Sequence, residues 1–512
     1  MRSSKLILAT AALALMTALA GCGGDPATSD DQTNNSTTDQ TDDSTPGNPS
    51  SKTYTVTFVS NGGNAVASQA VAEGGKATEP AAPTRSGYTF AGWFTDNDTF
   101  ASVATFPYTV TADITFYAKW LLNASGGTGV IEIRTAADLY NVRDNLSGNY
   151  ILMNDISLKD YSTGEGWKPI SGFTGKLNGN GYKITDLTIS TTSFYIGVGL
   201  FSDIEGGSVS NLGVEIAADG VKGSNCVGSI AGYVYIGTIT NCYSTGGGIS
   251  SNGSAGGIVG SVNGSKVIDC YSMGNISSIS SVSSCSGGIV GSANDNSIIT
   301  NCCSAGNISS STSSPSFATS YVSSSGGIVG VAASIIITNC YSTGSISSSS
   351  SPFADFSGYI AASGGIAGYV SGDDNAITNC YSTGNIASYI PDIHAGTTTS
   401  ASGGIVGYAY LHNNNAITSC VAINLKINGS GYNGRIVGFT STSYGSDNVT
   451  ISNNLALNTM IVTENQSWAT NGVGKTADDF LLQDTYQTGL GWDFVSTWKM
   501  SAGGGYPILY WQ

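Results

Sequence analysis

The residues with the clearest capacity for chemistry are six cysteines that return at one position of a repeated unit. Leu212 and Leu455 stand at the matching position of flanking units, which predicts an inward-facing row of buried thiols, a common role for free cysteine. Parallel, in-register cysteines have poor torsions for a disulfide. An oxidising export route still leaves some pairing open, with Cys226, Cys285 or Cys303 as further partners. The six are Cys242, Cys270, Cys302, Cys340, Cys380 and Cys420.

The remaining reactive residues do not form the patterns expected of a metal site or a catalytic site. One cysteine per unit along a line cannot converge tetrahedrally on a metal ion, and the two histidines, His394 and His412, are isolated. A metalloprotease would need a His-Glu-x-x-His helix. A glycan-cleaving enzyme would need paired carboxylates, and Asp373, Asp374 and Asp392 are expected in turns or a variable loop. We predict structural cysteines, no catalytic residue, no metal and no cofactor.

A tyrosine follows the cysteine in four units. If the cysteines face inward, these tyrosines face outward and stack in a row. Repetition alone produces such a row as padding between coils, and this is the favoured explanation. The alternative is an aromatic strip that binds glycan or protein partners, because tyrosine combines apolar area with a polar tip. The candidate binding surface is Tyr243, Tyr271, Tyr341 and Tyr381.

These cysteines and tyrosines belong to a sequence repeat. One spacing within the repeat is nearly constant, and the other varies in length. The cysteine follows a closing glycine by 10 to 13 residues, and the next closing glycine follows the cysteine by 18 to 28 residues. Length variation therefore falls on Ser-rich segments such as Ser309–Ser325 and Ser347–Ser363, which we expect to be loops on the binding side. The closing glycines are Gly232, Gly260, Gly291, Gly330, Gly368, Gly407 and Gly438.

Short apolar runs bounded by glycine, asparagine and serine predict short strands in each repeat. We expect an all-β fold, with about three strands per repeat and one repeat per coil of a right-handed parallel β-helix. Corners are expected at 294–296, 373–375 and 413–415, because asparagine and aspartate tolerate left-handed backbone. Further corners are expected at the asparagines that precede the cysteines, which are Asn241, Asn301, Asn339 and Asn379.

Composition limits the partners. Only 10% of the 512 residues are charged, and the net charge is −16. This balance argues against nucleic acid and against anionic membrane surfaces as electrostatic partners.

Residues 1–22 have the features of a targeting segment. Arg2 and Lys5 precede an apolar run from Leu6 to Leu19, and small residues lead to Cys22. The tetrapeptide 19–22 resembles the lipobox of bacterial lipoproteins, which implies cleavage before Cys22 and lipidation of that residue; an ordinary secretory signal is the alternative. Gly23, directly after the cysteine, favours the outer membrane as the destination of such a lipoprotein. Residues 23–52 are acidic and rich in serine and threonine, which predicts a disordered tether.

Residues 53–121 form a separate unit with strand-like ends. Its core motif, Gly87-Tyr-Thr-Phe-Ala-Gly-Trp93, and the surrounding glycines and prolines resemble the Listeria–Bacteroides repeat. The resemblance implies a small β-grasp-like module that serves as a spacer or interaction unit. Trp93, Tyr88 and Trp120 are expected in its core.

The remaining chain divides into three predicted parts. Residues 129–226 hold an N-terminal cap, with an amphipathic helix over Thr135–Leu146, and the first coils. Residues 227–440 hold the repeats, and 441–512 the last coils and a C-terminal cap. The Gly-Gly-Ile-Val-Gly and Asn-Cys-Tyr-Ser units are similar to the GLUG-repeat family, which includes adhesin-like surface lipoproteins and regions attached to IgA-cleaving proteases.

Three classes of function compete at this stage. We expect a lipid-anchored adhesin or interaction scaffold that binds glycan, matrix or protein partners through the solenoid loops. A polysaccharide-processing β-helix enzyme and a passive structural protein of the envelope are the alternatives. The first class accounts for the anchor, the tether, the spacer module and the elastic segments together.

Overall fold

The computed structural model describes residues 52–85, 88–97, 100, 102–122, 129–192, 197–313, 321–351, 358–391, 398–442, 448–463 and 471–512. The predicted signal segment with Cys22, and all of the predicted tether except Lys52, lie outside these residues. Among the residues described, no helix combines the length and the apolar character that crossing a membrane requires.

A small mixed sheet forms the first domain. Its strand order is β2-β1-β6-β4, with β1 and β6 parallel and both outer pairs antiparallel. Trp93 and Trp120 are each 1% exposed, as expected of core residues. The strands are β1 (Thr53–Val59), β2 (Gln69–Ala72), β4 (Tyr88–Phe94) and β6 (Ile114–Leu122), with the short pair β3 (Lys76–Ala77) and β5 (Tyr108–Thr109) beside them.

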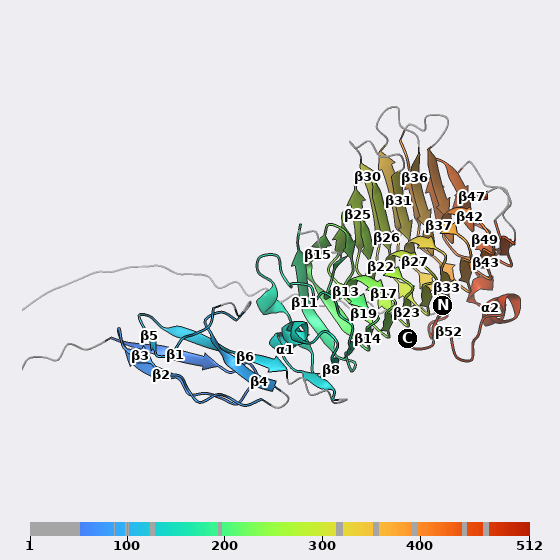
Figure 1. The fold of residues 1–512 in the computed structure, drawn as a ribbon. Coiled ribbons are helices and arrows are strands. Elements are labelled where there is room, and N and C mark those ends of the chain that lie inside the picture. Colours follow the sequence, from blue (N-terminus) through green and yellow to red (C-terminus); the bar gives the residue numbers. More distant parts are fainter. Residues whose placement is uncertain are drawn as a thin grey trace, which may run out of the picture. The chain divides into compact units, whose positions relative to one another are not determined.

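The second domain is a parallel β-helix, as predicted, with one repeat per coil (Figure 1). Each full coil holds five short strands, so the prediction of about three was wrong. The strands of successive coils stack in five parallel ladders, which we number in chain order within a coil. Within residues 227–440, a left-handed residue ends each short strand of the second ladder, as at Asp269 with φ of 54°, so the backbone that continues the coil belongs to a separate strand.

Ladders 1 and 2 carry the first two strands of each coil. Ladder 1 is β13 (Phe201–Glu205), β17 (Ala231–Tyr235), β22 (Val259–Asn263), β27 (Val290–Asn294), β32 (Val329–Ala333), β37 (Ala367–Gly372), β42 (Val406–Leu411) and β47 (Val437–Thr442). Ladder 2 is β7 (Ile131–Ile133), β8 (Asn149–Leu152), β10 (Lys176–Asn178), β14 (Ser208–Ser210), β18 (Thr238–Thr240), β23 (Lys266–Ile268), β28 (Ile298–Thr300), β33 (Ile336–Thr338), β38 (Ala376–Thr378), β43 (Ala416–Thr418) and β48 (Thr450–Ser452).

Ladder 3 begins on β9 (Ile156–Ser157), and two longer strands, β11 (Lys183–Ser190) and β15 (Gly213–Gly223), belong to both ladder 3 and ladder 4. Ladder 3 continues as β19 (Tyr243–Gly246), β24 (Tyr271–Ser272), β29 (Cys303–Ser304), β34 (Tyr341–Ser342), β39 (Tyr381–Ser382), β44 (Val421–Ala422), β49 (Leu455–Leu457) and β51 (Val473–Lys475). Ladder 4 continues as β20 (Ile249–Ser251), β25 (Ile276–Ser280), β30 (Ile308–Ser313), β35 (Ile346–Ser351), β40 (Ile386–Tyr389), β45 (Lys426–Gly429) and β50 (Ile461–Val462).

Ladder 5 completes each coil and faces ladder 4. It is β12 (Gly197–Val198), β16 (Cys226–Val227), β21 (Ser254–Gly256), β26 (Ser283–Gly287), β31 (Tyr321–Gly326), β36 (Tyr359–Gly364), β41 (Thr399–Gly403) and β46 (Tyr432–Gly434). Buried serine hydroxyls join the two ladders. The Oγ atom of Ser278 lies 2.7 Å from the Oγ atoms of both Ser284 and Ser286. The Oγ atoms of Ser348 and Ser363 are also 2.7 Å apart.

The Ser-rich segments are therefore mainly strands, which corrects the prediction of loops. Within 309–325 and 347–363, the residues that the structure describes lie almost entirely in β30, β31, β35 and β36, and only 314–320 and 352–357 fall outside the description. Inward hydroxyls satisfy one another, so a segment of consecutive serines can fill an interior without apolar side chains.

The predicted corners are confirmed. Asn241, Asn301, Asn339 and Asn379 all have φ between 51° and 54°, and Asp295, Asp374 and Asn414 are also left-handed. Their side chains form ladders of their own. For example, Asn339 Nδ2 donates to Asn301 Oδ1 at 3.2 Å, which ties one coil to the next.

The closing glycines stack where no side chain fits. A Cβ on Gly291 would lie 2.6 Å from the carbonyl oxygen of Gly260, and one on Gly330 would lie 2.5 Å from that of Gly291. Both contacts are with backbone, which cannot move aside without disturbing the neighbouring coil. Close approach of the coils therefore fixes the residue type at this position.

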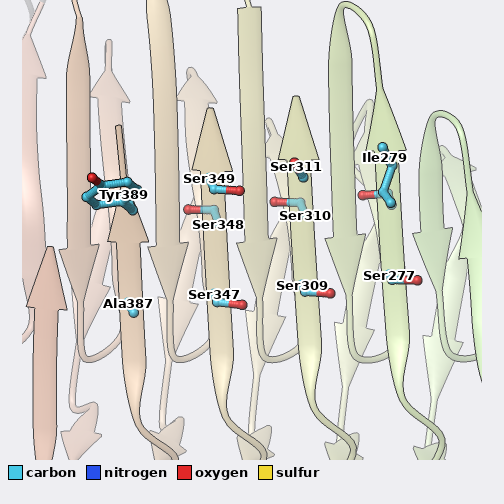
Figure 2. A pocket seen from close by; sticks show the side chains of 11 residues that line it. Ser277, Ile279, Ser309, Ser310, Ser311, Ser347, Ser348, Ser349, Ala387 and Tyr389 are labelled. Carbon is cyan, nitrogen blue, oxygen red and sulfur yellow. The ribbon is translucent and has the colours of Figure 1, made fainter. Parts of the chain in front are cut away.

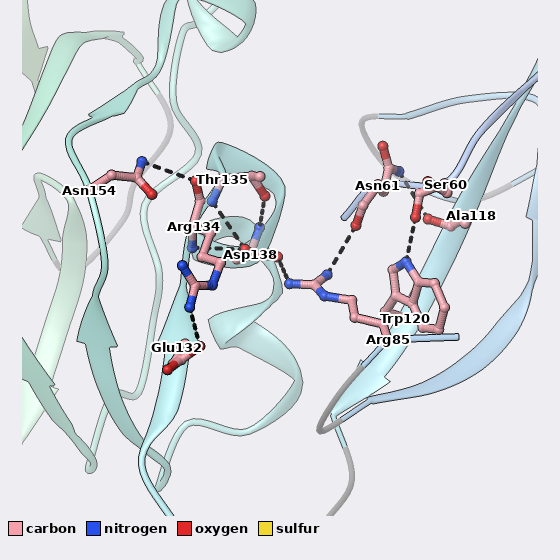
Figure 3. A network of polar contacts seen from close by, with 10 residues as sticks. All are labelled: Ser60, Asn61, Arg85, Ala118, Trp120, Glu132, Arg134, Thr135, Asp138 and Asn154. Atoms are coloured by element: carbon pink, nitrogen blue, oxygen red, sulfur yellow. Dashed lines mark hydrogen bonds and ion pairs between the residues drawn. The ribbon is translucent and has the colours of Figure 1, made fainter. Parts of the chain in front are cut away.

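Helices stand at both ends of the coil domain. The predicted N-terminal helix is shorter than expected: α1 spans Ala136–Tyr140, and a 3₁₀ turn, η1, spans Asn141–Asp144. Thr135 and Asp138 form a capping box, and Asp138 also accepts from Arg85 (Figure 3). The remaining elements are η2 (Lys159–Tyr161), η3 (Asp479–Leu481), α2 (Gln483–Leu490) and the hairpin of β52 (Trp498–Met500) and β53 (Pro507–Leu509).

Candidate functional site

The six repeat cysteines lie in the apolar interior, each at most 1% exposed. Every thiol sits 3.1–3.3 Å from the carbonyl oxygen two residues earlier in its own coil, so each weak S–H donor has an acceptor. Burial raises the pKa of the Cys242, Cys270 and Cys302 thiols well above its ordinary value. A buried, protonated thiol is a poor nucleophile, which agrees with the structural role expected of these cysteines.

One equivalence used in the sequence analysis was wrong. Leu455 pairs with Val421 in ladder 3, so the residue that matches Cys420 is Asn454. Asn454 Oδ1 accepts from the backbone N–H of Cys420 at 2.8 Å, and its Nδ2 donates to the carbonyl of Ile417. The thiol row therefore ends on a buried amide that satisfies backbone groups. Leu212 does occupy the predicted position, because Gly213 pairs with Tyr243.

The nine cysteines that the structure describes are all free thiols. Cys226 and Cys285 belong to ladder 5, each paired with Ser254 from either side, so one coil separates them. Cys303 occupies the tyrosine row of ladder 3, between Tyr271 and Tyr341.

The predicted tyrosine row forms two stacked pairs. The rings of Tyr243 and Tyr271 lie 5.0 Å apart with an angle of 8° between their planes, and those of Tyr341 and Tyr381 lie 4.9 Å apart at 3°. Stacked rings turn their faces toward one another. Stacking in a pair therefore occupies one face of each ring and leaves that face closed to a ligand.

The C-terminal segment covers half of this row, so Tyr341 and Tyr381 do not form the open aromatic strip that was the alternative to padding. Tyr341 is 9% and Tyr381 2% exposed, because Trp498 packs beside both rings at 6.3 and 6.0 Å. Gln512 accepts from the Tyr341 hydroxyl at 2.9 Å and donates to the Cys303 sulfur at 3.2 Å. Tyr243 and Tyr271 remain partly exposed, and Trp511 stacks on Tyr271 with 5.9 Å between the ring centres. A row of apolar rings needs cover, and the tryptophans of the same chain supply it.

A groove crosses the outer face of ladder 4 and is the candidate site. Its floor is one residue from each of six consecutive coils in register: Lys222, Ser250, Ser277, Ser309, Ser347 and Ala387. A second outward row runs beside it: Ile279, Ser311, Ser349 and Tyr389 (Figure 2). We call this surface the serine groove.

Two confluent hollows give the serine groove its depth. One, of about 280 Å³, is lined by the outward serines of β25, β30 and β35 together with Ile279 and Tyr389. The other, of about 460 Å³, continues toward β15 and includes Asp219, Lys222, Asn275 and Asn307. Ser277 and Ser309 line both hollows, so the two are continuous.

The serine groove offers hydrogen bonds rather than reactive groups. Serine and asparagine supply its uncharged polar groups, and Asp219 and Lys222 at one end are the charged residues among its lining. Tyr389 and Ile279 are 57% and 59% exposed and form an apolar wall at opposite ends of the second outward row, three coils apart. Such a lining suits an uncharged, polar ligand. Sequence reasoning missed the groove, because the consecutive serines after Ile276, Ile308 and Ile346 do not show which hydroxyls face outward.

The acidic and histidine candidates do not assemble a reactive centre in the residues described. Asp373 Oδ1 accepts from the backbone N–H of Asn413 at 2.9 Å, and His412 lies 4.0 Å from the same oxygen. Asp374 accepts from the amide of Asn414, so both carboxylates serve a corner. Asp392 and His394 lie outside the described residues. No group of three or more histidine, cysteine or acidic side chains in the described ranges is close enough to hold a metal ion.

A second aromatic cluster, which sequence reasoning did not single out, lies on the outer face of ladder 1. Tyr369 and Tyr408 stack at 5.2 Å, and Phe439 continues the row at 5.0 Å from Tyr408. Tyr432 packs against Phe439 at 4.5 Å and is 43% exposed. Burial raises the pKa of Tyr369 to about 12.

Comparison with known proteins identifies the first domain. Residues 54–119 match the Listeria-Bacteroides repeat domain. Over 89 residues the chain is 37% identical to a provisionally named Gly-rich membrane protein of Evansella cellulosilytica, and over 126 residues it is 33% identical to halomucin of Haloquadratum walsbyi. These matches cover 16% and 25% of this chain, and 10% and 1% of the relatives, so the chain spans a small part of their length.

Solved structures also show partial similarity. A protein of Bacteroides ovatus, provisionally named an immunoglobulin A1 protease, superposes on 74% of this chain and 92% of its own, with a TM-score of 0.36 and 20% identity. A structure named IgA1 protease superposes on 74% of this chain and 26% of its own, with a TM-score of 0.36 and 15% identity.

Proposed function

We propose that the protein is a cell-surface binding scaffold, held to the outer membrane by a lipid on Cys22 and making contact through the serine groove. The observation that carries the proposal is the groove itself, a hydrogen-bonding surface built in register across six coils. Because the coils are already rigid, a ligand would not have to order flexible loops when it binds. This saves conformational entropy and favours binding.

The comparisons support a surface location. The Evansella relative is named a membrane protein, and the first domain matches a repeat module that suits a spacer between anchor and solenoid. The sequence before that domain carries the lipobox-like tetrapeptide and the acidic segment. Lipidation of Cys22, a tether and a spacer would together present the coils away from the bilayer.

Binding without turnover is the activity that this surface supports best. Hydrolysis of a glycan needs two carboxyl groups on opposite sides of the scissile bond. The serine groove contributes Asp219 as its one carboxylate, at one end of its described lining. We therefore propose a binding protein and not an enzyme.

The test is a binding and turnover assay on the same sample. Full-length protein, purified in detergent, is incubated with insoluble polysaccharides, matrix proteins and whole cells, and both retention and release of reducing sugars are measured. We expect retention on at least one surface and no release of sugars. Release of sugars would instead support the polysaccharide-processing alternative. Membrane fractionation of wild type against Cys22→Ser tests the anchor, and only wild type should remain with the outer membrane.

A further inference from the structure

We infer that the serine groove holds one linear, uncharged polysaccharide that lies across the strands, with one sugar unit for each coil. The inference rests on the proposed binding function and names the ligand class. Three features of the groove carry it: its repeat distance, its lining and its charge.

The repeat distance fits an extended sugar chain. Neighbouring strands in a sheet lie about 4.8 Å apart, so the floor residues recur at that step. A pyranose in an extended, equatorially linked polysaccharide advances its chain by a closely similar distance. Each successive sugar would therefore lie beside one floor hydroxyl, at Ser250, Ser277, Ser309 and Ser347.

The lining fits the two kinds of surface on a sugar. Serine hydroxyls and the side chains of Asn275 and Asn307 can exchange hydrogen bonds with sugar hydroxyls. Tyr389 and Ile279 present exposed apolar area to the C–H faces of the sugars. Protein partners are less well matched, because protein interfaces have an apolar centre rich in aromatic side chains and arginine.

The charge excludes acidic polysaccharides. The whole chain carries −16, and Lys222 is the lone cation among the described lining of the groove. A polyanion would be repelled by the protein as a whole and would find little compensation in the groove. An uncharged glucan, mannan or xylan avoids this repulsion.

The experiment is calorimetric titration of full-length protein in detergent with cellotriose, cellotetraose, cellopentaose and cellohexaose. Six floor residues predict that affinity rises with each added sugar up to the hexamer. Ser347→Arg should fill the floor and lower the affinity for cellohexaose by about tenfold or more, and Tyr389→Ala should lower it by about tenfold, as expected for loss of one wall.

Ile336→Arg is the matched control, since Ile336 is an exposed outward residue of β33 on ladder 2, away from the groove. It adds the same side chain and should leave affinity unchanged. Polygalacturonate tests charge and should not bind. The inference is overturned if wild type binds cells or matrix proteins but no neutral oligosaccharide, or if Ser347→Arg binds cellohexaose as wild type does. If wild type is retained on no surface at all, the proposed function falls as well.

Discussion

The hydroxyl of Tyr381 donates a hydrogen bond of 2.7 Å to the carbonyl oxygen of Pro507, 126 residues later in the chain. This bond joins the middle of the coil stack to the hairpin of β52 and β53. Tyr381 is 2% exposed, so the bond is shielded from water and the carbonyl has little alternative partner. The contact shows how the C-terminal segment is held against ladder 3.

Tyr381→Phe should lower the free energy of unfolding by about 1–2 kcal/mol, because it removes the donor and leaves a buried carbonyl unsatisfied. Urea denaturation followed by tryptophan fluorescence measures the change. Tyr243→Phe is the control, since Tyr243 is partly exposed and lies beyond the region that Trp498 covers. Equal stability of the two variants would contradict the role given to this bond.

Alkaline pH should weaken the contact between the buried tyrosines of ladder 3 and the C-terminal segment. Burial raises the pKa of Tyr341 and Tyr381 above the ordinary tyrosine value of 10.0, and that of Tyr369 to about 12. Because these folded-state pKa values are raised, the stabilisation is complete below pH 10 and is lost as pH rises toward and through them. Absorbance at the tyrosinate band should show a late-titrating class, and unfolding should accompany it. Titration of all tyrosines at their ordinary pKa would refute the packing described for these rings.

Gly291→Ala should prevent close stacking of the coils. The new Cβ would lie 2.6 Å from a backbone oxygen of the neighbouring coil, so we expect loss of about 3 kcal/mol or more, or failure to fold. Gly503→Ala provides the comparison, because a Cβ there meets no atom within 4 Å and should be tolerated. Thermal unfolding by circular dichroism distinguishes them. A wild-type melting temperature for Gly291→Ala would show that the coils can move apart freely.

Thiol labelling should separate the cysteines by burial. Cys226 is the partly exposed thiol in the described ranges, so it should react first with a maleimide under native conditions, and the ladder cysteines only after denaturation. Gln512→Ala should speed labelling of Cys303, whose sulfur the Gln512 amide contacts. Mass spectrometry of labelled peptides gives the order. Rapid native labelling of Cys340 would contradict its burial in the interior.

Sequence reasoning succeeded where the repeat imposes a local physical requirement. Asparagine before the cysteine predicted a left-handed corner, and Asn301 and Asn339 have φ of 53° and 54°. Cysteine at a constant position predicted an inward row, and Cys302 and Cys340 are fully buried. In both cases the residue type follows from its own backbone or its immediate surroundings.

Sequence reasoning failed where the position of a side chain depends on a residue far away in the chain, or where the register of a strand is ambiguous. Consecutive serines have no apolar alternation, so nothing marks Ser348 as inward and Ser347 as outward until ladder 5 supplies the partner Ser363. The doubled asparagine at 453–454 allowed a slip of one residue, which placed Leu455 on the wrong face. No local pattern predicts that Pro507 returns to Tyr381.

Growth of the stack by whole coils has a further consequence for the serine groove. Each coil contributes one residue to every row, so duplication or deletion of a repeat would lengthen or shorten the contact surface in steps of one strand spacing, leaving the chemistry of each position intact. Extra residues in the connections between ladders 4 and 5 would leave the outward rows of the serine groove in register. The architecture thus separates the reach of the surface from its recognition chemistry, and evolution could adjust either one alone.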